Sequence, residues 1–290
     1  MRSFLFVPGN NPSMVQNADV FGADVVIFDL EDSVHAGEKD NARHLLQDFF
    51  NNNPTPPKKI AVRINAPDSP FYDADLGSIV SDKIDYIVLP KASIQTTQKL
   101  GSDLFQLEQN KQIEKRIDII PIIELACSLI NAHKIAATSR VKALLFGAED
   151  YCSDLEIKRT LSGEALVYPR SLIATTCKAY GLIAIDTPFT DVMDDEGLNQ
   201  DCQNGVMLGM SAKAAIHPRQ IAIINDKFSP GQDQVAWSLK VIKADKEASK
   251  KGLGVFSLDG KMIDKPIIER AMKTLNRAKE YQMLGDFDEE

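Results

Sequence analysis

Short apolar segments recur along residues 1–220, and most of them end next to a charged or polar side chain. Stretches long enough for crossover helices separate them. This alternation is typical of a parallel sheet buried on both faces. A length of 290 residues accommodates one such domain with an appendage, so we predict an α/β fold, a TIM (β/α)8 barrel with a C-terminal helical extension. The predicted strands are Phe4–Val7, Val25–Leu30, Ile60–Ile64, Tyr86–Leu89, Asp118–Ile123, Ala143–Phe146, Leu182–Ile185 and Ala212–Ile216.

The pattern changes after His217-Pro218-Arg219, where helical periodicity replaces the strand-like segments. Gly252 and Gly254 end one predicted helix, and Pro266 begins a final one, because proline favours the first helical position. We read the glycine-flanked segment 252–265 as a hinge between these helices. The chain is therefore expected to consist of a barrel with the active site over residues 1–220 and a helical extension, serving as a lid, over residues 221–290.

Composition excludes several classes of partner. The net charge is −8 and no run of Lys or Arg stands out, so neither nucleic acid nor an anionic membrane is expected to bind. The apolar segment Phe4–Val7 is too short for a signal peptide or a membrane span. The four cysteines form no Cys-x-x-Cys pair, which argues against structural zinc and favours free thiols in the cytoplasm.

Two carboxylates follow neighbouring predicted strands. Glu124 comes directly after the strand that ends at Ile123, and Asp150 follows the next strand along the chain. All strands of a TIM barrel open their carboxyl ends onto one face, which holds the active site. One or two carboxylates, with water and substrate oxygens, are the usual ligands of Mg²⁺. We therefore predict a Mg²⁺ site at Glu124 and Asp150; the alternative is that each carboxylate pairs with a nearby Lys or Arg.

Arg63 lies near the end of another predicted strand and is expected to point into the same mouth. A guanidinium there can hold a substrate carboxylate or a developing oxyanion with two parallel hydrogen bonds. The alternative is a salt bridge to Glu31 or Asp32, and both can hold at once. Lys91 and Asp186 are expected to belong to the supporting network.

Two further polar residues, His217 and Asp264, lie outside the group of residues at the strand ends. His217 precedes a proline and is expected to play a structural role through hydrogen bonds. Asp264 lies outside the predicted barrel, just before the final helix. An acidic residue there stabilises the helix by interacting with the positive end of its dipole. The alternative is that Asp264 acts as a mobile acid/base carried by a lid.

A larger set of segments carries a family resemblance. They are Arg2–Gly9, Asp29–Val34 followed by Lys39 and Ala42-Arg43, Arg63–Asn65, Pro90-Lys91, Phe146–Tyr151, Ala184–Asp191, His217–Gln220, Gly252–Val255 and Gly260–Pro266. Together they resemble the family of citrate lyase beta subunits, malyl-CoA lyases and HpcH/HpaI aldolases over nearly the whole chain. The chain departs from the family pattern at Gly209–Lys213 and at Pro169.

The resemblance implies a Mg²⁺-dependent TIM barrel that makes or breaks a carbon–carbon bond beside a thioester. It assigns Glu124 and Asp150 as metal ligands and Arg63 as a substrate-binding, catalytic residue. It also assigns Asp264 as an acid/base supplied by a neighbouring subunit, which implies a homo-oligomer. We further expect Glu31, Asp32 and Glu124 to contribute to substrate binding.

The expected activity is retro-Claisen cleavage of a citryl thioester to oxaloacetate and an acetyl thioester. The acyl group would ride on coenzyme A or on an acyl carrier protein, and citrate lyase alpha and gamma subunits are expected partners in the second case. One alternative is a free-standing malyl-CoA, methylmalyl-CoA or citramalyl-CoA lyase. Another, from a different class, is a non-catalytic assembly subunit.

Overall fold

The computed structural model describes residues 1–53, 58–160, 163–250 and 252–283. The chain divides into two compact units, Met1–Phe228 and Ser229–Glu290. The first unit extends past the expected limit at residue 220, because helix α10 (Ile221–Lys227) groups with the barrel. No helix among the described residues is long and apolar enough to cross a membrane.

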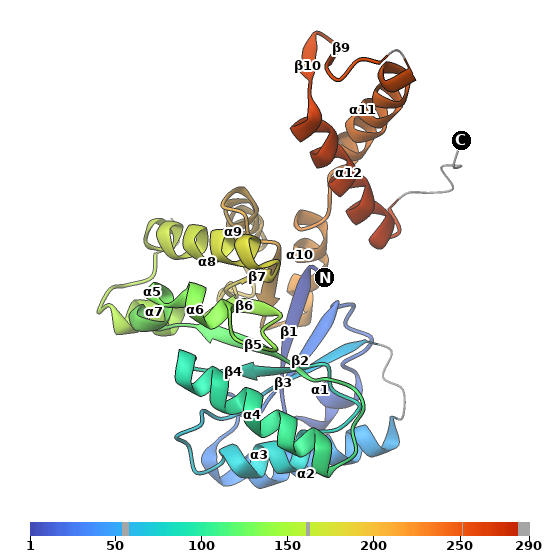
Figure 1. Cartoon of the computed structure of the whole chain (residues 1–290). Coiled ribbons are helices and arrows are strands. Elements are labelled where there is room, and N and C mark those ends of the chain that lie inside the picture. Colours follow the sequence, from blue (N-terminus) through green and yellow to red (C-terminus); the bar gives the residue numbers. More distant parts are fainter. Residues whose placement is uncertain (54–57, 161–162, 251, 284–290) are drawn as a thin grey trace. The chain divides into compact units, whose positions relative to one another are not determined.

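The first unit is a closed barrel whose strands run in chain order and pair in parallel (Figure 1). The prediction of a TIM barrel is therefore confirmed, and each predicted strand lies within two residues of an observed one. The strands are β1 (Ser3–Pro8), β2 (Val25–Asp29), β3 (Lys59–Arg63), β4 (Tyr86–Leu89), β5 (Asp118–Ile123), β6 (Ala143–Phe146), β7 (Ile183–Asp186) and β8 (Ala212–Ala215).

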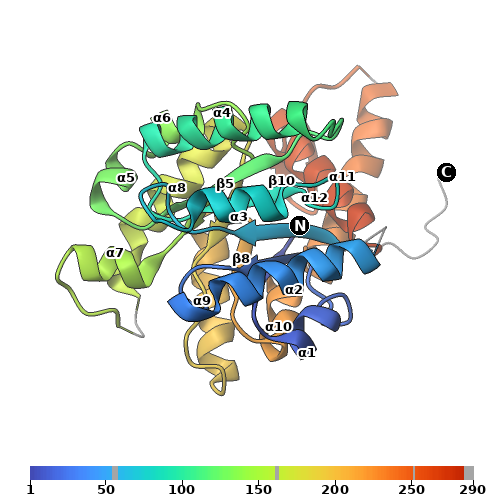
Figure 2. The ribbon, with the colours of Figure 1, turned by 90° about the horizontal axis from the view of Figure 1, so that it is seen from below.

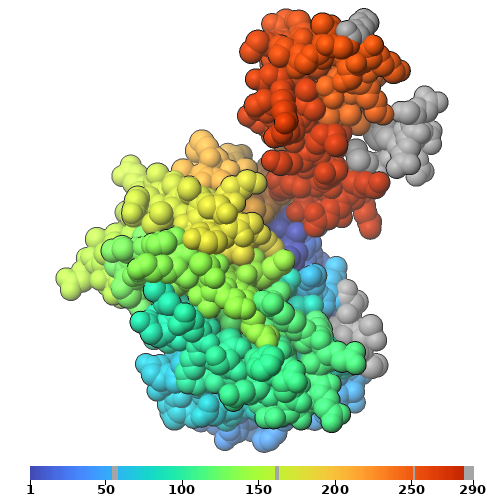
Figure 3. All heavy atoms as spheres, in the orientation of Figure 1, coloured from blue at the N-terminus to red at the C-terminus, as the bar shows by residue number. Residues whose placement is uncertain are grey.

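Helices lie outside the strands and cover their outer face (Figure 1 and Figure 2). In the space-filling view, atoms of α3 and α4 pack over the side of the barrel that faces the viewer (Figure 3). The α-helices of this unit, besides α10, are α1 (Pro12–Gln16), α2 (Lys39–Asn52), α3 (Tyr72–Ile79), α4 (Ile94–Asn110), α5 (Ala126–Ile130), α6 (Ala132–Ala136), α7 (Ala148–Asp154), α8 (Val167–Tyr180) and α9 (Asp195–Met207). Short 3-10 helices are Ala36–Glu38, Glu164–Leu166 and Pro218–Gln220.

The strand alternation decides which side chains reach the barrel mouth. Successive residues of a strand point to opposite faces, and Val25 and Ile27 of β2 pack in the barrel interior. Asp29 continues that series at the end of β2. The same alternation carries Arg63 of β3 and Glu124, directly after β5, to the interior side. The barrel geometry therefore gathers these three ionisable groups at one opening.

The second unit contains α11 (Gln232–Lys250), β9 (Phe256–Leu258), β10 (Lys261–Ile263) and α12 (Lys265–Glu280). The expectation of a hinge over residues 252–265 is wrong, because β9 and β10 form an antiparallel hairpin there. Asp259 and Gly260 make its turn, both with positive φ, as a two-residue type I′ turn requires. Ile263 packs against Val241 and Ala271, so the hairpin shares a small core with both helices.

Candidate active site

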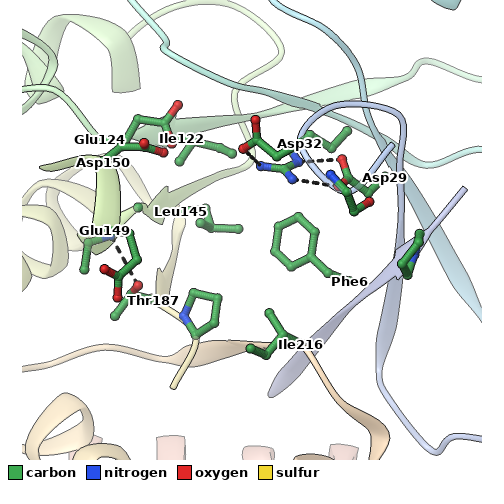
Figure 4. Close-up of a pocket in the computed structure, with 16 residues that line it drawn as sticks. Phe6, Asp29, Asp32, Ile122, Glu124, Leu145, Glu149, Asp150, Thr187 and Ile216 are labelled. Carbon is green, nitrogen blue, oxygen red and sulfur yellow. Dashed lines mark hydrogen bonds and ion pairs between the residues drawn. The ribbon is translucent and has the colours of Figure 1, made fainter. Parts of the chain in front are cut away.

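A cavity of about 300 Å³ opens at the carboxyl ends of the strands (Figure 4). One part of its wall is acidic and contains Glu124, Glu149 and Asp150. Arg63 also lines the cavity, where it pairs with Asp29 and Asp32. The rest of the wall is mostly apolar or uncharged: Phe6, Pro8, Ser33, Ile122, Leu145, Gly147, Ala148, Thr187, Pro188 and Ile216. The structure thus brings together most of the predicted site residues.

Glu124 is buried, with 3% of its surface exposed. Its Oε1 accepts a 2.5 Å hydrogen bond from the backbone N–H of Lys91, which adopts a left-handed conformation at φ 47°. Burial raises the pKa of Glu124 to about 8, and the negative charges of Asp150 and Glu31 add to this effect. In the metal-free site Glu124 therefore holds its proton more tightly than an exposed glutamate does.

Gly147 allows Glu124 to occupy this position. A Cβ atom on Gly147 would lie 2.6 Å from the Glu124 Cβ and 2.7 Å from its Oε2. Gly147 is also the N-cap of α7, whose first turn carries Glu149 and Asp150. The close approach of backbone to carboxylate therefore sets Glu124 beside the start of α7.

Asp150 is exposed and lies beside Glu124 (Figure 4). Among the residues that the structure describes, neither carboxylate forms an ion pair with Lys or Arg, so the alternative of paired carboxylates is not observed. Two carboxylates without a cation partner are a donor set that fits Mg²⁺. Within the described residues no group of three or more His, Cys, Asp or Glu could hold a metal ion, so water and substrate oxygens would complete the coordination.

Arg63 makes more ion pairs than we predicted. Its Nε and Nη2 donate to both oxygens of Asp29, at 2.6 and 2.7 Å. Its Nη1 lies 2.9 Å from Glu31 Oε2 and 3.3 Å from Asp32 Oδ2, so the expected salt bridges are present as well. The guanidinium also lies 5.1 Å from the centre of the Phe6 ring. Arg63 is therefore held in a fixed orientation at the edge of the cavity.

Asp29 is the principal partner of Arg63 and was missed in the sequence. The register pairs Asp29 directly with Arg63 across β2 and β3, a relation that only strand pairing reveals. Burial would raise the pKa of Asp29, but the hydrogen bonds and charge of Arg63 outweigh it and the pKa is lowered. Asp29 also accepts the N–H groups of Glu31 and Ser33, so it shapes the loop after β2.

Glu31 has a buried oxygen beside Arg63 but does not itself line the cavity. Its Oε2 has no hydrogen-bond partner of good geometry, although it lies near Arg63. Burial raises the pKa of Glu31 to about 7, with Asp32 and Asp29 adding to the effect and Arg63 opposing it. The Lys39 ammonium fixes the loop from behind through the carbonyls of Leu30 and Glu31, both at 2.7 Å.

The remaining predicted residues have supporting contacts in the structure. Asp186 is buried and forms ion pairs with Arg170 and Lys213. His217 caps a short helix, where its Nδ1 accepts the N–H of Arg219. Asp264 belongs to the second unit and is the N-cap of α12, with its Oδ1 accepting the Ile267 N–H at 3.3 Å.

The raised pKa of Glu124 predicts how stability changes with pH. Its pKa of about 8 in the folded protein exceeds the ordinary 4.5, so the folded state holds the proton more tightly. The stability of the metal-free protein should therefore fall as pH rises from about 4.5 to 8. Glu124→Gln removes this loss and should be more stable than the parent at pH 8.5, by on the order of a few kcal/mol, with little difference at pH 5. Urea unfolding in EDTA measures the difference; equal pH slopes in both proteins would contradict it.

Comparisons with known proteins agree with the barrel and identify the family. Residues 2–218 match the family described as HpcH/HpaI aldolase/citrate lyase. The citrate lyase subunit beta of Leuconostoc mesenteroides subsp. cremoris is 37% identical over 283 residues, covering 96% of this chain and 93% of that protein. Human mitochondrial citramalyl-CoA lyase is 28% identical over 289 residues, covering 96% of this chain and 85% of that protein.

A solved structure supports the same fold and family. The crystal structure of CitE from Mycobacterium tuberculosis, in complex with magnesium, acetoacetate and coenzyme A, aligns with a TM-score of 0.78 at 29% identity. The alignment covers 96% of this chain and 98% of that one. The likeness therefore extends over both units of the chain.

Proposed function

Because the chain belongs to the HpcH/HpaI aldolase/citrate lyase family, we propose that it is a Mg²⁺-dependent carbon–carbon lyase that cleaves a citryl thioester to oxaloacetate and an acetyl thioester. One observation carries the proposal. Glu124 and Asp150 stand side by side at the barrel mouth, no Lys or Arg of the described residues pairs with either, and Arg63 lines the same cavity. The magnesium and coenzyme A of the Mycobacterium tuberculosis protein and the beta subunits of citrate lyase support it.

Each residue has a chemical task in this proposal. Glu124 and Asp150 would hold Mg²⁺, which supplies Lewis-acid polarisation of the substrate hydroxyl and its adjacent carboxylate when it is bound. Arg63 would face the substrate oxygen on which negative charge develops and would stabilise that charge. Its ion pairs with Asp29 and Glu31 hold it in the required orientation. Glu31 and Asp32 would orient Arg63 and contact the polar substrate.

The bond changes are those of a retro-Claisen cleavage. The hydroxyl gives its proton to solvent, its oxygen becomes the ketone of the oxo acid, and the electron pair of the broken carbon–carbon bond passes to the thioester as an enolate. Asp264 would give a proton to the enolate carbon and so form the acetyl thioester. Asp264 is the N-cap of α12 in the second unit. In this proposal it reaches a barrel as part of a lid or from a neighbouring subunit, and the second case would make the active form a homo-oligomer.

A second candidate is a free-standing citramalyl-CoA lyase, favoured by the 28% identity to the human enzyme over nearly the whole chain. Malyl-CoA and methylmalyl-CoA lyases remain the other substrate choices. A panel of acyl-CoA and acyl-carrier substrates separates them by their products. A citryl thioester releases oxaloacetate and a citramalyl thioester releases pyruvate, whereas malyl and methylmalyl thioesters both release glyoxylate and differ in the acetyl or propionyl thioester that is left. Oxaloacetate as the dominant product supports the proposal, and pyruvate as the dominant product supports the alternative.

Partners and location follow from the same proposal. A citryl thioester on an acyl carrier protein would call for citrate lyase alpha and gamma subunits, whereas coenzyme A would not. Co-purification with an acyl carrier protein and a transferase distinguishes the two, and a complex without any activity would support the assembly-subunit alternative.

We also propose a cytoplasmic location, which the four free cysteines support.

Replacement of Arg63 tests its proposed role. Arg63→Lys keeps the charge but loses the planar fork that bonds both oxygens of Asp29. We expect kcat/KM to fall by at least ~10²-fold, the scale of losing one oxyanion donor. Arg140→Lys is the matched control, because Arg140 makes a similar fork with Glu108, a residue outside the cavity. Full activity in Arg63→Lys would make Arg63 a structural ion-pair residue.

A further inference from the structure

A buried charge network lies on the outer side of β7 and β8, beneath α8 and α9. It contains two cations, Arg170 and Lys213, and two carboxylates, Asp186 and Asp201. Arg170, Asp186 and Lys213 are at most 1% exposed. The ion-pair distances run from 2.6 to 2.8 Å, and a network whose charges all have partners is rigid.

This network fixes the end of β7. The Lys213 ammonium donates to Asp186 and Asp201 and uses its third hydrogen bond, at 2.7 Å, on the carbonyl of Thr187. Helix α9 approaches Asp186 so closely that a Cβ on Gly205 would lie 2.9 Å from its Oδ2. The backbone at Thr187 is therefore anchored from behind the barrel wall.

Thr187 connects this charge network to the proposed metal site. Its side chain is buried and lines the cavity, and its Oγ1 accepts a 3.2 Å hydrogen bond from the N–H of Ala148 (Figure 4). Ala148 is the first residue of α7, where backbone N–H groups have no partner within the helix. Asp150 lies two residues further along the same turn.

We propose that Thr187 is a positioning residue whose hydroxyl fixes the start of α7 and thereby sets Asp150 beside Glu124. The proposal rests on the metal site of the proposed function. A second contact holds α7 independently: Arg159 pairs with Glu149 at 2.8 Å and donates to the Pro188 carbonyl at 2.9 Å. Loss of the Thr187 hydroxyl should therefore shift Asp150 without unfolding the helix.

The test is Mg²⁺ affinity measured by calorimetry in the full chain. Thr187→Val keeps the shape of the side chain but removes its hydroxyl, and should weaken Mg²⁺ binding by about tenfold or more, the range for residues that orient metal ligands. Thr187→Ser keeps the hydroxyl and should bind nearly as the parent does. Thr187→Ala repeats the deletion without adding bulk, in case the valine variant does not fold.

Two controls separate the possible failures. Thr97→Val removes another buried hydroxyl, one that bonds the Ser93 carbonyl in α4, and should leave Mg²⁺ affinity unchanged. Glu124→Gln should lose Mg²⁺ binding. If Glu124→Gln loses Mg²⁺ binding while Thr187→Val and Thr187→Ala bind Mg²⁺ normally, the positioning role is wrong and the proposed function stands. If Glu124→Gln itself binds Mg²⁺ normally, the metal site and the positioning role both fail.

Discussion

Glu124→Gln and Asp150→Asn should each abolish measurable Mg²⁺ binding and reduce turnover by at least ~10³-fold, on the scale of lost electrostatic stabilisation at a reacting centre. Both substitutions preserve side-chain size but remove the negative charge that a hard cation requires. The fold should survive, because neither side chain belongs to the apolar core. Calorimetry with Mg²⁺ and steady-state kinetics of the two variants check the prediction.

The matched control for these variants is Glu108→Gln. Glu108 is a buried carboxylate like Glu124, with 6% of its surface exposed against 3%, but it is paired with Arg140 away from the cavity. Its substitution should cost stability and leave Mg²⁺ affinity unchanged. Normal Mg²⁺ affinity in Glu124→Gln alone would contradict its assignment as a ligand, and normal affinity in both Glu124→Gln and Asp150→Asn would leave no ligand for the proposed metal site.

Asp264→Ala should lower turnover by ~10²–10⁴-fold, the usual contribution of a general acid, while Mg²⁺ and oxo-acid binding stay unchanged. Asp264 also caps α12, so alanine removes a helix cap together with the acid. Asp264→Asn separates the two effects, because asparagine caps a helix as well as aspartate does but cannot supply the proton. An active Asp264→Asn protein would make Asp264 a capping residue only.

Mixed subunits test whether Asp264 acts on a neighbouring barrel. Asp264→Ala and Glu124→Gln proteins should each be inactive alone, yet regain activity when they form hetero-oligomers. Some mixed interfaces then pair an intact barrel with an intact Asp264. Native mass spectrometry shows whether the hetero-oligomers form. If they form but stay inactive, the idea of a shared site is contradicted.

The barrel could be predicted because its strands are buried on both faces and read as short apolar runs. Position at a strand end was enough to single out Arg63 and Glu124. It was not enough to find Asp29 as the partner of Arg63, because that pairing depends on the register between β2 and β3. Strand parity was the available signal: Asp29 stands two residues after the interior Ile27.

Two other features show different limits of the sequence. The hairpin turn at Asp259-Gly260 was readable, since an Asp-Gly dipeptide between two short segments that contain apolar residues is a strong signal for a two-residue turn. The role of Lys213 was not readable. A lysine in the middle of a four-residue strand gives no sign that Asp186 and Asp201, from other elements, surround its ammonium.

The most direct test of the account is Mg²⁺-dependent cleavage of citryl-CoA by the purified chain, followed as release of oxaloacetate. We predict that oxaloacetate and acetyl-CoA form in equal amounts, that EDTA stops the reaction, that added Mg²⁺ restores it, and that Glu124→Gln is inactive throughout. Cleavage that continues undiminished in EDTA and in Glu124→Gln would contradict the central claim that the carboxylate pair at the barrel mouth drives the reaction.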